Sequence, residues 1–254
     1  MLINIFVKLK EQEMSGSNVA VLFRSYAKND SLVEEVVGRA LVSIRKANSL
    51  MFDRVFVVVP TDYDCGATSA YLAQAITAAD SLRAEVFPAV GHHSCGALNQ
   101  ALAALVGTVA YVAIVSNKAS GYLSAEVLAR ALLLLEGGLK VVGVRISELD
   151  EVHESPIENT FAIWDLEALL AVGGFDSELG VEEVAPLARL MQKFGACAAL
   201  ISAEQGDAKL NVRKSADGQA RHDEVRSTKR ERQGLEAARV GVTLDWMKSN
   251  IVVM

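Results

Sequence analysis

The sequence is short of cysteine, of long apolar runs and of excess positive charge, and each shortage excludes a class of protein. Its three cysteines are an odd number and form no Cys-x-x-Cys pair, which argues against a disulfide scaffold and a structural zinc site. A reducing cytoplasm is therefore the expected location. With 25 basic and 31 acidic side chains the formal charge is −6, whereas a general binder of nucleic-acid polymers needs a basic face.

Membrane segments and the common nucleotide motifs are also missing. The longest apolar runs, 102–115 and 125–135, are interrupted well before the roughly 20 residues of a membrane span. The stretch 2–9 lacks the basic region and the cleavage site of a signal peptide. No Walker A, Gly-x-Gly-x-x-Gly or Gly-x-Ser-x-Gly pattern occurs at a strand-to-helix turn, so the usual signatures of ATPases, dinucleotide oxidoreductases and α/β-hydrolases are absent.

What the chain does contain is an apolar fraction of 51%, arranged as short β-branched runs that alternate with helical patterns. Strands without polar alternation, separated by helices of about ten or more residues, indicate a parallel sheet that is covered on both faces. The predicted class is a doubly wound α/β fold. We expect strands at 19–23, 55–59, 85–87, 109–115 and 140–146, separated by helices at 32–44, 67–82, 94–105 and 124–135.

The pattern changes after Ser147. Residues 204–239 carry nine basic and seven acidic side chains, so this stretch is positively charged within an acidic chain. The sequence predicts one α/β domain over 1–203 and a polar, charged extension over 204–254, which is an arm or a helix. Within the domain we expect an antiparallel edge strand at 160–164, helices at 166–171 and 182–194, and a last strand at 196–201.

Five short strings follow one another along the chain: 19–26 (Val-Ala-Val-Leu-Phe-Arg-Ser-Tyr), 57–68 (Val-Val-Val-Pro-Thr-Asp-Tyr-Asp-Cys-Gly-Ala-Thr), 93–102 (His-Ser-Cys-Gly-Ala-Leu-Asn-Gln-Ala-Leu), 162–176 (ending Val-Gly-Gly-Phe-Asp) and 180–190 (Gly-Val-Glu-Glu-Val-Ala-Pro-Leu-Ala-Arg-Leu). In this order they resemble the motifs of the family-2-like glycosyltransferases of GT-A fold. The resemblance implies a Rossmann-type, mostly parallel sheet with helices on both faces and a small antiparallel C-terminal part. It also implies a domain that binds a nucleotide-diphosphate sugar.

The resemblance assigns the donor site, with one departure. It implies that the nucleotide contacts Arg24, Ser25, Tyr26 and Asp62, although turn chemistry alone also explains Asp62. The family's metal-binding Asp-x-Asp should follow the strand that ends at Val115, but the sequence there reads Ser116-Asn117-Lys118. A hard cation such as Mn²⁺ or Mg²⁺ prefers carboxylate ligands, so no metal is expected at this turn. The ammonium of Lys118 could neutralise the diphosphate instead, and a solvated loop lysine is the alternative.

The resemblance also assigns the base and the acceptor side. It places the carboxylate that takes the acceptor's proton on Glu183, with Glu182 and Asp176 as neighbours. An acidic first turn that complements the helix dipole explains the same residues without catalysis. Asn99 is either a hydrogen-bonding group at the site or a packed asparagine. Trp164 is either an acceptor platform or a core residue.

The sequence thus predicts a glycosyltransferase that uses a nucleotide-diphosphate sugar, an acceptor of unknown identity and no metal. One alternative is a catalytically degenerate GT-A-like protein that binds a sugar nucleotide or a protein partner. Another is a sugar nucleotidyltransferase, but the glycine-rich loop expected after 19–23 is missing. The extension 204–254 could fold over a diphosphate or hold the second subunit of a homodimer.

Overall fold

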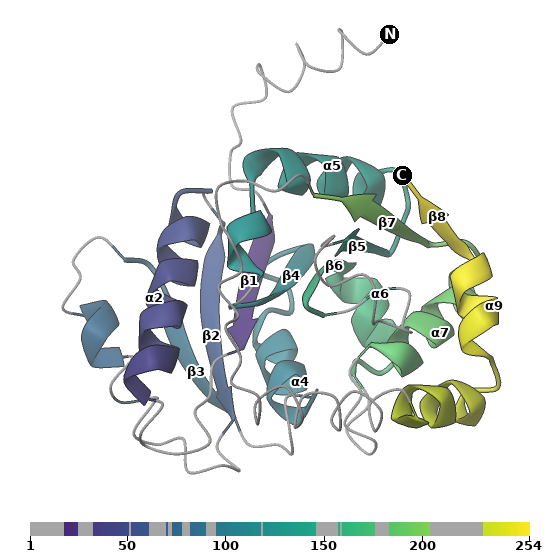
Figure 1. Ribbon diagram of the computed structural model, residues 1–254, viewed down its shortest axis with the longest axis horizontal. Coiled ribbons are helices and arrows are strands. Elements are labelled where there is room, and N and C mark those ends of the chain that lie inside the picture. The colour runs from purple at the N-terminus through teal and green to yellow at the C-terminus, as the bar shows by residue number, and fades with distance from the viewer. Residues whose placement is uncertain are drawn as a thin grey trace, which may run out of the picture.

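The computed structural model describes residues 18–24, 33–50, 52–60, 70, 73–77, 82–89, 95–117, 119–145, 157, 159–175, 183–203 and 231–254. Its strands are β1 (Val19–Arg24), β2 (Arg54–Pro60), β3 (Glu85–Ala89), β4 (Tyr111–Ser116), β5 (Val141–Arg145), β6 (Phe161–Asp165), β7 (Ala198–Ser202) and β8 (Ile251–Val253). They form one eight-stranded sheet in the order β3-β2-β1-β4-β6-β5-β7-β8 (Figure 1). Neighbouring strands are parallel except at β6, which runs antiparallel to both β4 and β5.

The helices lie between the strands, as the sequence predicts. Polar side chains begin three of them: Ser124, Asp165 and Thr243 each accept a hydrogen bond from a backbone N–H of the first helical turn. No helix among the described residues is long and apolar enough to cross a bilayer. The helices are α2 (Val33–Asn48), α4 (Cys95–Ala104), the 3₁₀ turn η2 (Ser120–Tyr122), α5 (Ala125–Glu136), α6 (Leu166–Ala171), α7 (Val184–Phe194) and α9 (Leu244–Ser249), and residues 70, 73–77 and 231–239 are also helical.

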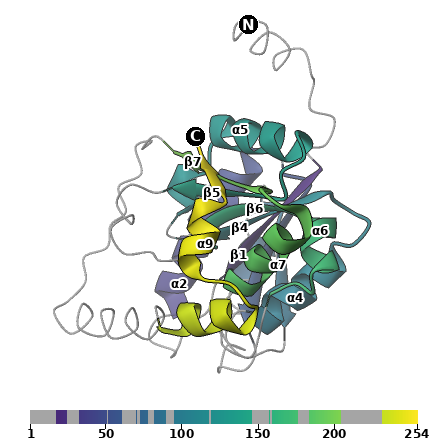
Figure 2. The ribbon, with the colours of Figure 1, turned by 90° about the vertical axis from the view of Figure 1, so that its right-hand side faces the viewer.

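The sheet separates two hydrophobic cores. Successive residues of a strand point to opposite faces, so Leu22 of β1 lies in one core and Val21 and Phe23 lie in the other. Helices α4, α6 and α7 cover the first face, together with residues from 231–254 (Figure 2). Helices α2 and α5 cover the second face. Because both faces are buried, the strands are apolar throughout, and the prediction of a doubly wound α/β fold is confirmed.

Two details of the predicted strands are wrong. The strand expected at 160–164 is antiparallel, but it lies inside the sheet between β4 and β5 and not at an edge. Phe161 to Trp164 are buried on both faces, which fits an internal position. The strand expected at 55–59 extends by one residue at each end, and its last residue, Pro60, lies opposite Ala89 of β3.

Residues 231–254 add to the same sheet. Strand β8 lies next to β7 (Figure 1) and pairs with it in parallel. In this register Ile251 lies opposite Ala198. Ala237 and Met247 are 1% and 0% exposed and belong to the core that α4, α6 and α7 cover. The predicted domain boundary after residue 203 stays a prediction, since 204–230 lie outside the described residues.

Candidate functional site

The carboxyl ends of the parallel strands meet at one edge of the sheet, where open α/β sheets bind their ligands. Arg24 ends β1 and Ser116 ends the adjacent strand β4, and these two residues are register partners. Because β6 is antiparallel, its beginning lies at the same edge. The backbone N–H of Ser116 donates to the carbonyl of Thr160, just before β6, at 2.8 Å. The structure therefore brings Arg24, where the predicted nucleotide-binding turn begins, beside Ser116, where the predicted diphosphate-binding turn begins.

The turn after β4 is held by its own backbone and side chains. The N–H of Ala119 donates to the carbonyl of Ser116 at 2.8 Å, and the Ser120 hydroxyl donates to the carbonyl of Asn117 at 2.9 Å. Ser116 and Asn117 are both half-buried at the edge of the sheet. The turn 116–122 contains no carboxylate, so its donor set does not fit a hard divalent cation. Across the part of the chain that the structure describes, no group of three or more His, Cys, Asp or Glu side chains could hold a metal.

Asn99 ties helix α4 to the loop that follows α6. Its Nδ2 donates to the carbonyl of Phe175, and its Oδ1 accepts from the N–H of Phe175, both at 2.8 Å. Gly174 has a φ of +69°, and a Cβ there would lie 2.6 Å from Asn99 Oδ1. On the other side of the loop, Arg189 of α7 donates to the carbonyl of Val172 at 3.4 Å. Asn99 thus holds the Val-Gly-Gly-Phe loop in place.

Trp164 lies in the core, as the packing alternative expected. It is 0% exposed, and its indole N–H donates to Asn159 Oδ1 at 3.0 Å. The ring of Phe175 meets it edge-on, with the two centroids 5.6 Å apart. A ring buried in this way offers no surface on which an acceptor could stack, so the acceptor-platform reading of Trp164 is not supported. Its aromatic surface stabilises the Asn99-bound loop instead.

Glu183 immediately precedes α7 and is 2% exposed. Its side chain makes no capping hydrogen bond to its own helix. That bond comes from Glu236, whose Oε1 accepts from the N–H of Ala185 at 3.0 Å. Gln233 Nε2 lies 3.3 Å from Glu183 Oε1 and donates to it. A predicted catalytic carboxylate therefore lies in a buried polar cluster with two residues of the C-terminal segment.

Gln233 and Glu236 were not predicted as site residues, because they fall in the polar, charged extension expected over 204–254. They are 2% and 0% exposed, and Ala237 beside them is 1% exposed. Their spacing of i, i+3 and i+4 is that of one helix face. An amide, a carboxylate and a methyl on one face of a short helix give little signal, because they carry no apolar stripe.

Most of the remaining predicted site residues lie outside the described residues. Arg24 is described by its backbone alone, at the end of β1. Ser25, Tyr26, Asp62, Lys118, Asp176 and Glu182 are not among the described residues. Their assignment to a nucleotide, diphosphate or acceptor therefore stays a prediction.

A surface hollow of about 460 Å³ lies at the opposite end of β4. Tyr111, the first residue of β4, and Asp165, the last residue of the antiparallel β6, both line it. Asp165 also accepts from Lys140 Nζ at 2.8 Å, and this bond raises the pKa of Lys140. Burial, followed by the charges of Glu136 and Asp165, raises the pKa of the Tyr111 hydroxyl. This hollow is at the amino ends of the parallel strands, away from the edge where such sheets bind ligands.

The fold and its carboxyl edge define a GT-A-like α/β protein, with a mostly parallel sheet, one internal antiparallel strand and helices on both faces. A mannosyltransferase from Pyrobaculum calidifontis, solved in complex with GDP-Man and Mn²⁺, matches 98% of this chain and 79% of its own chain with a TM-score of 0.61 and 16% identity. A 4-diphosphocytidyl-2C-methyl-D-erythritol synthase from Anaerococcus prevotii matches 82% of this chain and 97% of its own, with a TM-score of 0.45 and 12% identity.

The sequence comparisons add no family assignment. No protein-family model matches the chain, and no curated protein matches its sequence. At 16% identity the likeness to the mannosyltransferase establishes the fold alone. The activity must therefore be argued from the site.

Proposed function

We propose that this protein binds a nucleotide-diphosphate sugar at the carboxyl edge of its sheet and transfers the sugar to an acceptor hydroxyl. The observation that carries the proposal is the position of Glu183. Its carboxylate is buried before the first turn of α7, and the capping of that helix is performed by Glu236. A carboxylate that is held in a polar cluster without capping its own helix is suited to accept a proton.

The reaction would proceed by direct displacement. The acceptor oxygen forms a bond to the anomeric carbon of the sugar while the bond from that carbon to the diphosphate oxygen breaks. Glu183 takes the proton of the acceptor hydroxyl, and the nucleoside diphosphate leaves with the electron pair of the broken bond. The positive end of α7 stabilises the carboxylate before it is protonated.

The donor would lie across the ends of β1 and β4. In this proposal Arg24, Ser25, Tyr26 and Asp62 contact the nucleotide, and the turn Ser116-Asn117-Lys118 contacts the diphosphate. The register pairing of Arg24 with Ser116 supports a single site built from both turns. Because the second turn has no carboxylate, the positive charge on the diphosphate side comes from Lys118 and not from a metal. The chain would act in the reducing cytoplasm that its cysteine content favours.

The first experiment tests donor binding and metal dependence together. The melting temperature is measured with GDP-, UDP- and TDP-sugars, each in the presence of EDTA or of Mn²⁺. A sugar nucleotide at 100 times its Kd stabilises the native state by about 2.7 kcal/mol, which is a readily measured shift. We expect one donor to raise the melting temperature in EDTA, and Lys118→Ala to weaken that shift. Stabilisation only with Mn²⁺ would contradict the metal-free site, and no stabilisation by any donor would overturn the proposed function.

The second experiment tests catalysis. Slow hydrolysis of the stabilising donor is measured for the parent protein, for Glu183→Gln and for Glu126→Gln. Glu126 is an exposed acidic residue in the first turn of α5. It serves as a control for a carboxylate that only interacts favourably with a helix dipole. We expect Glu183→Gln to lose at least about a hundredfold in rate, the scale of general-base catalysis, and Glu126→Gln to keep the parent rate. Donor binding with no turnover in the parent protein would instead identify a sugar-nucleotide-binding protein.

A further inference from the structure

The N-terminus of α7 is capped by a residue from far along the chain. Glu236, 51 residues after Ala185, accepts the N–H of Ala185 at 3.0 Å. Glu236 is 0% exposed, and it takes the capping position that the side chain of Glu183 leaves unused. Two buried carboxylates therefore share one helix N-terminus, and the positive end of the helix dipole offsets part of their mutual repulsion.

Gln233 makes the second contact of this cluster. Its Nε2 donates to Glu183 Oε1 at 3.3 Å, and its side chain is 2% exposed. Gln233 and Glu236 are three residues apart on the helical segment 231–239, so they lie on the same helix face and reach Glu183 and Ala185 together. An amide donor is suited to this position because it stabilises a carboxylate without adding a charge.

The segment that carries both residues is firmly packed. Ala237 and Met247 lie in the core, and β8 pairs with β7. A second hydrogen bond from a side-chain amide joins the same segment to α7, because Gln192 Nε2 donates to the carbonyl of Val240 at 2.9 Å. Segment 231–254 is therefore a fixed support along α7 (Figure 2). A support of this kind can hold a side chain in one orientation.

We propose that Gln233 is a positioning residue, which orients the carboxylate of Glu183 for proton transfer from the acceptor. The inference rests on the proposed function, since it assigns Glu183 the role of base. The hydrogen bond to Oε1 fixes the rotation of the carboxylate about its last torsion, which is otherwise broad. Glu236 contributes indirectly, because it supplies the hydrogen bond to the N-terminus of α7 that the side chain of Glu183 does not make.

Replacing two glutamines, one at a time, distinguishes a role of Gln233 in orienting Glu183 from a general role in holding segment 231–254 to α7. Gln233→Met and Gln192→Met each remove one amide hydrogen bond between segment 231–254 and α7 and keep nearly the same side-chain volume. The kcat and KM for hydrolysis are measured with GDP-mannose, or with whichever GDP-, UDP- or TDP-sugar raises the melting temperature most. We expect Gln233→Met to lower kcat about tenfold or more with KM within twofold of the parent, since a misplaced catalytic group lowers the rate of the chemical step. Gln192→Met should leave both constants within twofold.

A double-substitution cycle then shows whether Gln233 acts through Glu183. In the Glu183→Gln background, Gln233→Met should change kcat less than twofold, because the group that it orients is already gone. If Gln233→Met does not fold, Gln233→Asn replaces it, since this shorter amide keeps the polarity but not the reach. Equal kcat values for the Gln233 and Gln192 variants would overturn the positioning role while leaving the proposed function intact. Unchanged kcat in Glu183→Gln would overturn both.

Discussion

Asn99 of α4 and Phe175 of the loop after α6 form a pair of reciprocal hydrogen bonds, each 2.8 Å long, across 76 residues of sequence. The amide of one side chain satisfies both the donor and the acceptor of one backbone residue. This loop leads directly into Asp176 and the segment that precedes Glu183. The asparagine of the Gly-Ala-Leu-Asn string thus holds the Val-Gly-Gly-Phe loop against α4.

Because of these two hydrogen bonds, Asn99→Asp should destabilise the fold although the two side chains are nearly equal in size. The carboxylate can still accept from the Phe175 N–H, but its second oxygen would face the Phe175 carbonyl, which also has no proton to donate. We expect a loss of about 1–3 kcal/mol in the free energy of unfolding, measured by urea denaturation. Ala103→Gln on the exposed face of the same helix should change it by less than about 0.5 kcal/mol. Equal free energies of unfolding for Asn99→Asp and Ala103→Gln would mean that the Asn99–Phe175 hydrogen bonds contribute nothing to stability.

Replacing Gly174 with alanine should destabilise the protein more than replacing Gly241, which has a similar backbone conformation. Gly174 and Gly241 have φ values of +69° and +78°, so both substitutions carry the cost of a left-handed residue, about 1–2 kcal/mol. A Cβ at Gly174 would also lie 2.6 Å from Asn99 Oδ1, whereas at Gly241 nothing lies within 4 Å. Thermal unfolding should therefore show Gly174→Ala to be less stable than Gly241→Ala by at least about 1 kcal/mol. A smaller loss at Gly174 would contradict the described packing.

The buried thiol of Cys197 should make the fold sensitive to alkaline pH. Burial is the main cause that raises the pKa of this thiol from 9.0 to about 11. An unfolded chain therefore releases the thiol proton at lower pH than the folded chain, so the stabilising contribution is complete below pH 9 and is lost as the pH rises toward 11. The loss should amount to about 2 kcal/mol. Cys197→Ala should flatten the decline between pH 9 and 11 in urea titrations, and an unchanged slope would contradict the burial of the thiol.

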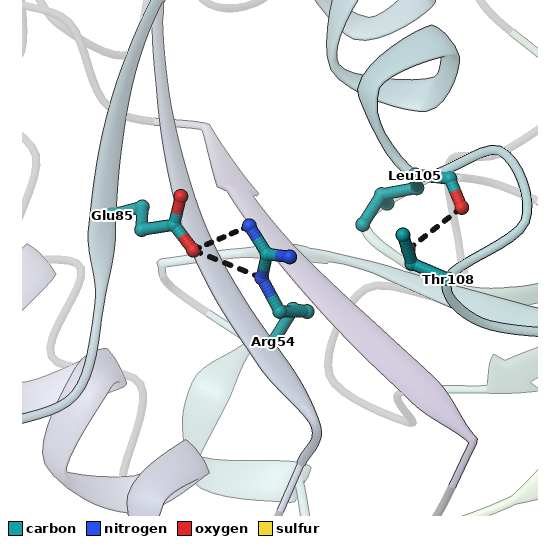
Figure 3. A network of polar contacts seen from close by, with 4 residues as sticks. All are labelled: Arg54, Glu85, Leu105 and Thr108. Atoms are coloured by element: carbon teal, nitrogen blue, oxygen red, sulfur yellow. Dashed lines mark hydrogen bonds and ion pairs between the residues drawn. The ribbon is translucent and has the colours of Figure 1, made fainter.

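The Arg54–Glu85 pair should contribute little to stability. It joins β2 to β3, with Glu85 Oε1 2.9 Å from Arg54 Nε and 2.6 Å from Nη2 (Figure 3). The two side chains are 38% and 57% exposed, so water and salt screen the attraction. Glu85→Gln should lower the free energy of unfolding by less than about 1 kcal/mol at low salt and by less still at high salt. A large loss that persists at high salt would indicate a role beyond charge pairing.

Much of the fold could be predicted because its strands are local apolar runs. The runs at 19–23 and 109–115 appear as β1 and β4, and the helix expected at 166–171 is α6. The position of β6 was missed, because a run of four apolar residues, 161–164, shows which faces are buried but not which strands are neighbours. Strand β8 was missed because its three residues are too few to form a pattern, and only pairing with β7 makes them a strand.

The candidate site was less predictable than the fold. Asn99 and Glu183 could be found from short strings, but their partners could not, since Phe175 is 76 residues from Asn99 and Gln233 is 50 residues from Glu183. For Trp164 the residue could be found from the sequence, but its role could not. An aromatic residue has the same appearance in sequence whether it lies in the core or at a binding surface, and only its burial in the folded structure distinguishes the two.

The sequence by itself determined the alternation of strands and helices, and with it a sheet buried on both faces. It could do so because backbone conformation and apolar periodicity depend on residues close together in the chain. The tertiary structure decided the order of the strands and the burial of Glu183 among Gln233 and Glu236. Those outcomes depend on contacts between distant segments, where a buried polar group is stable only if folding brings its hydrogen-bond partner to it.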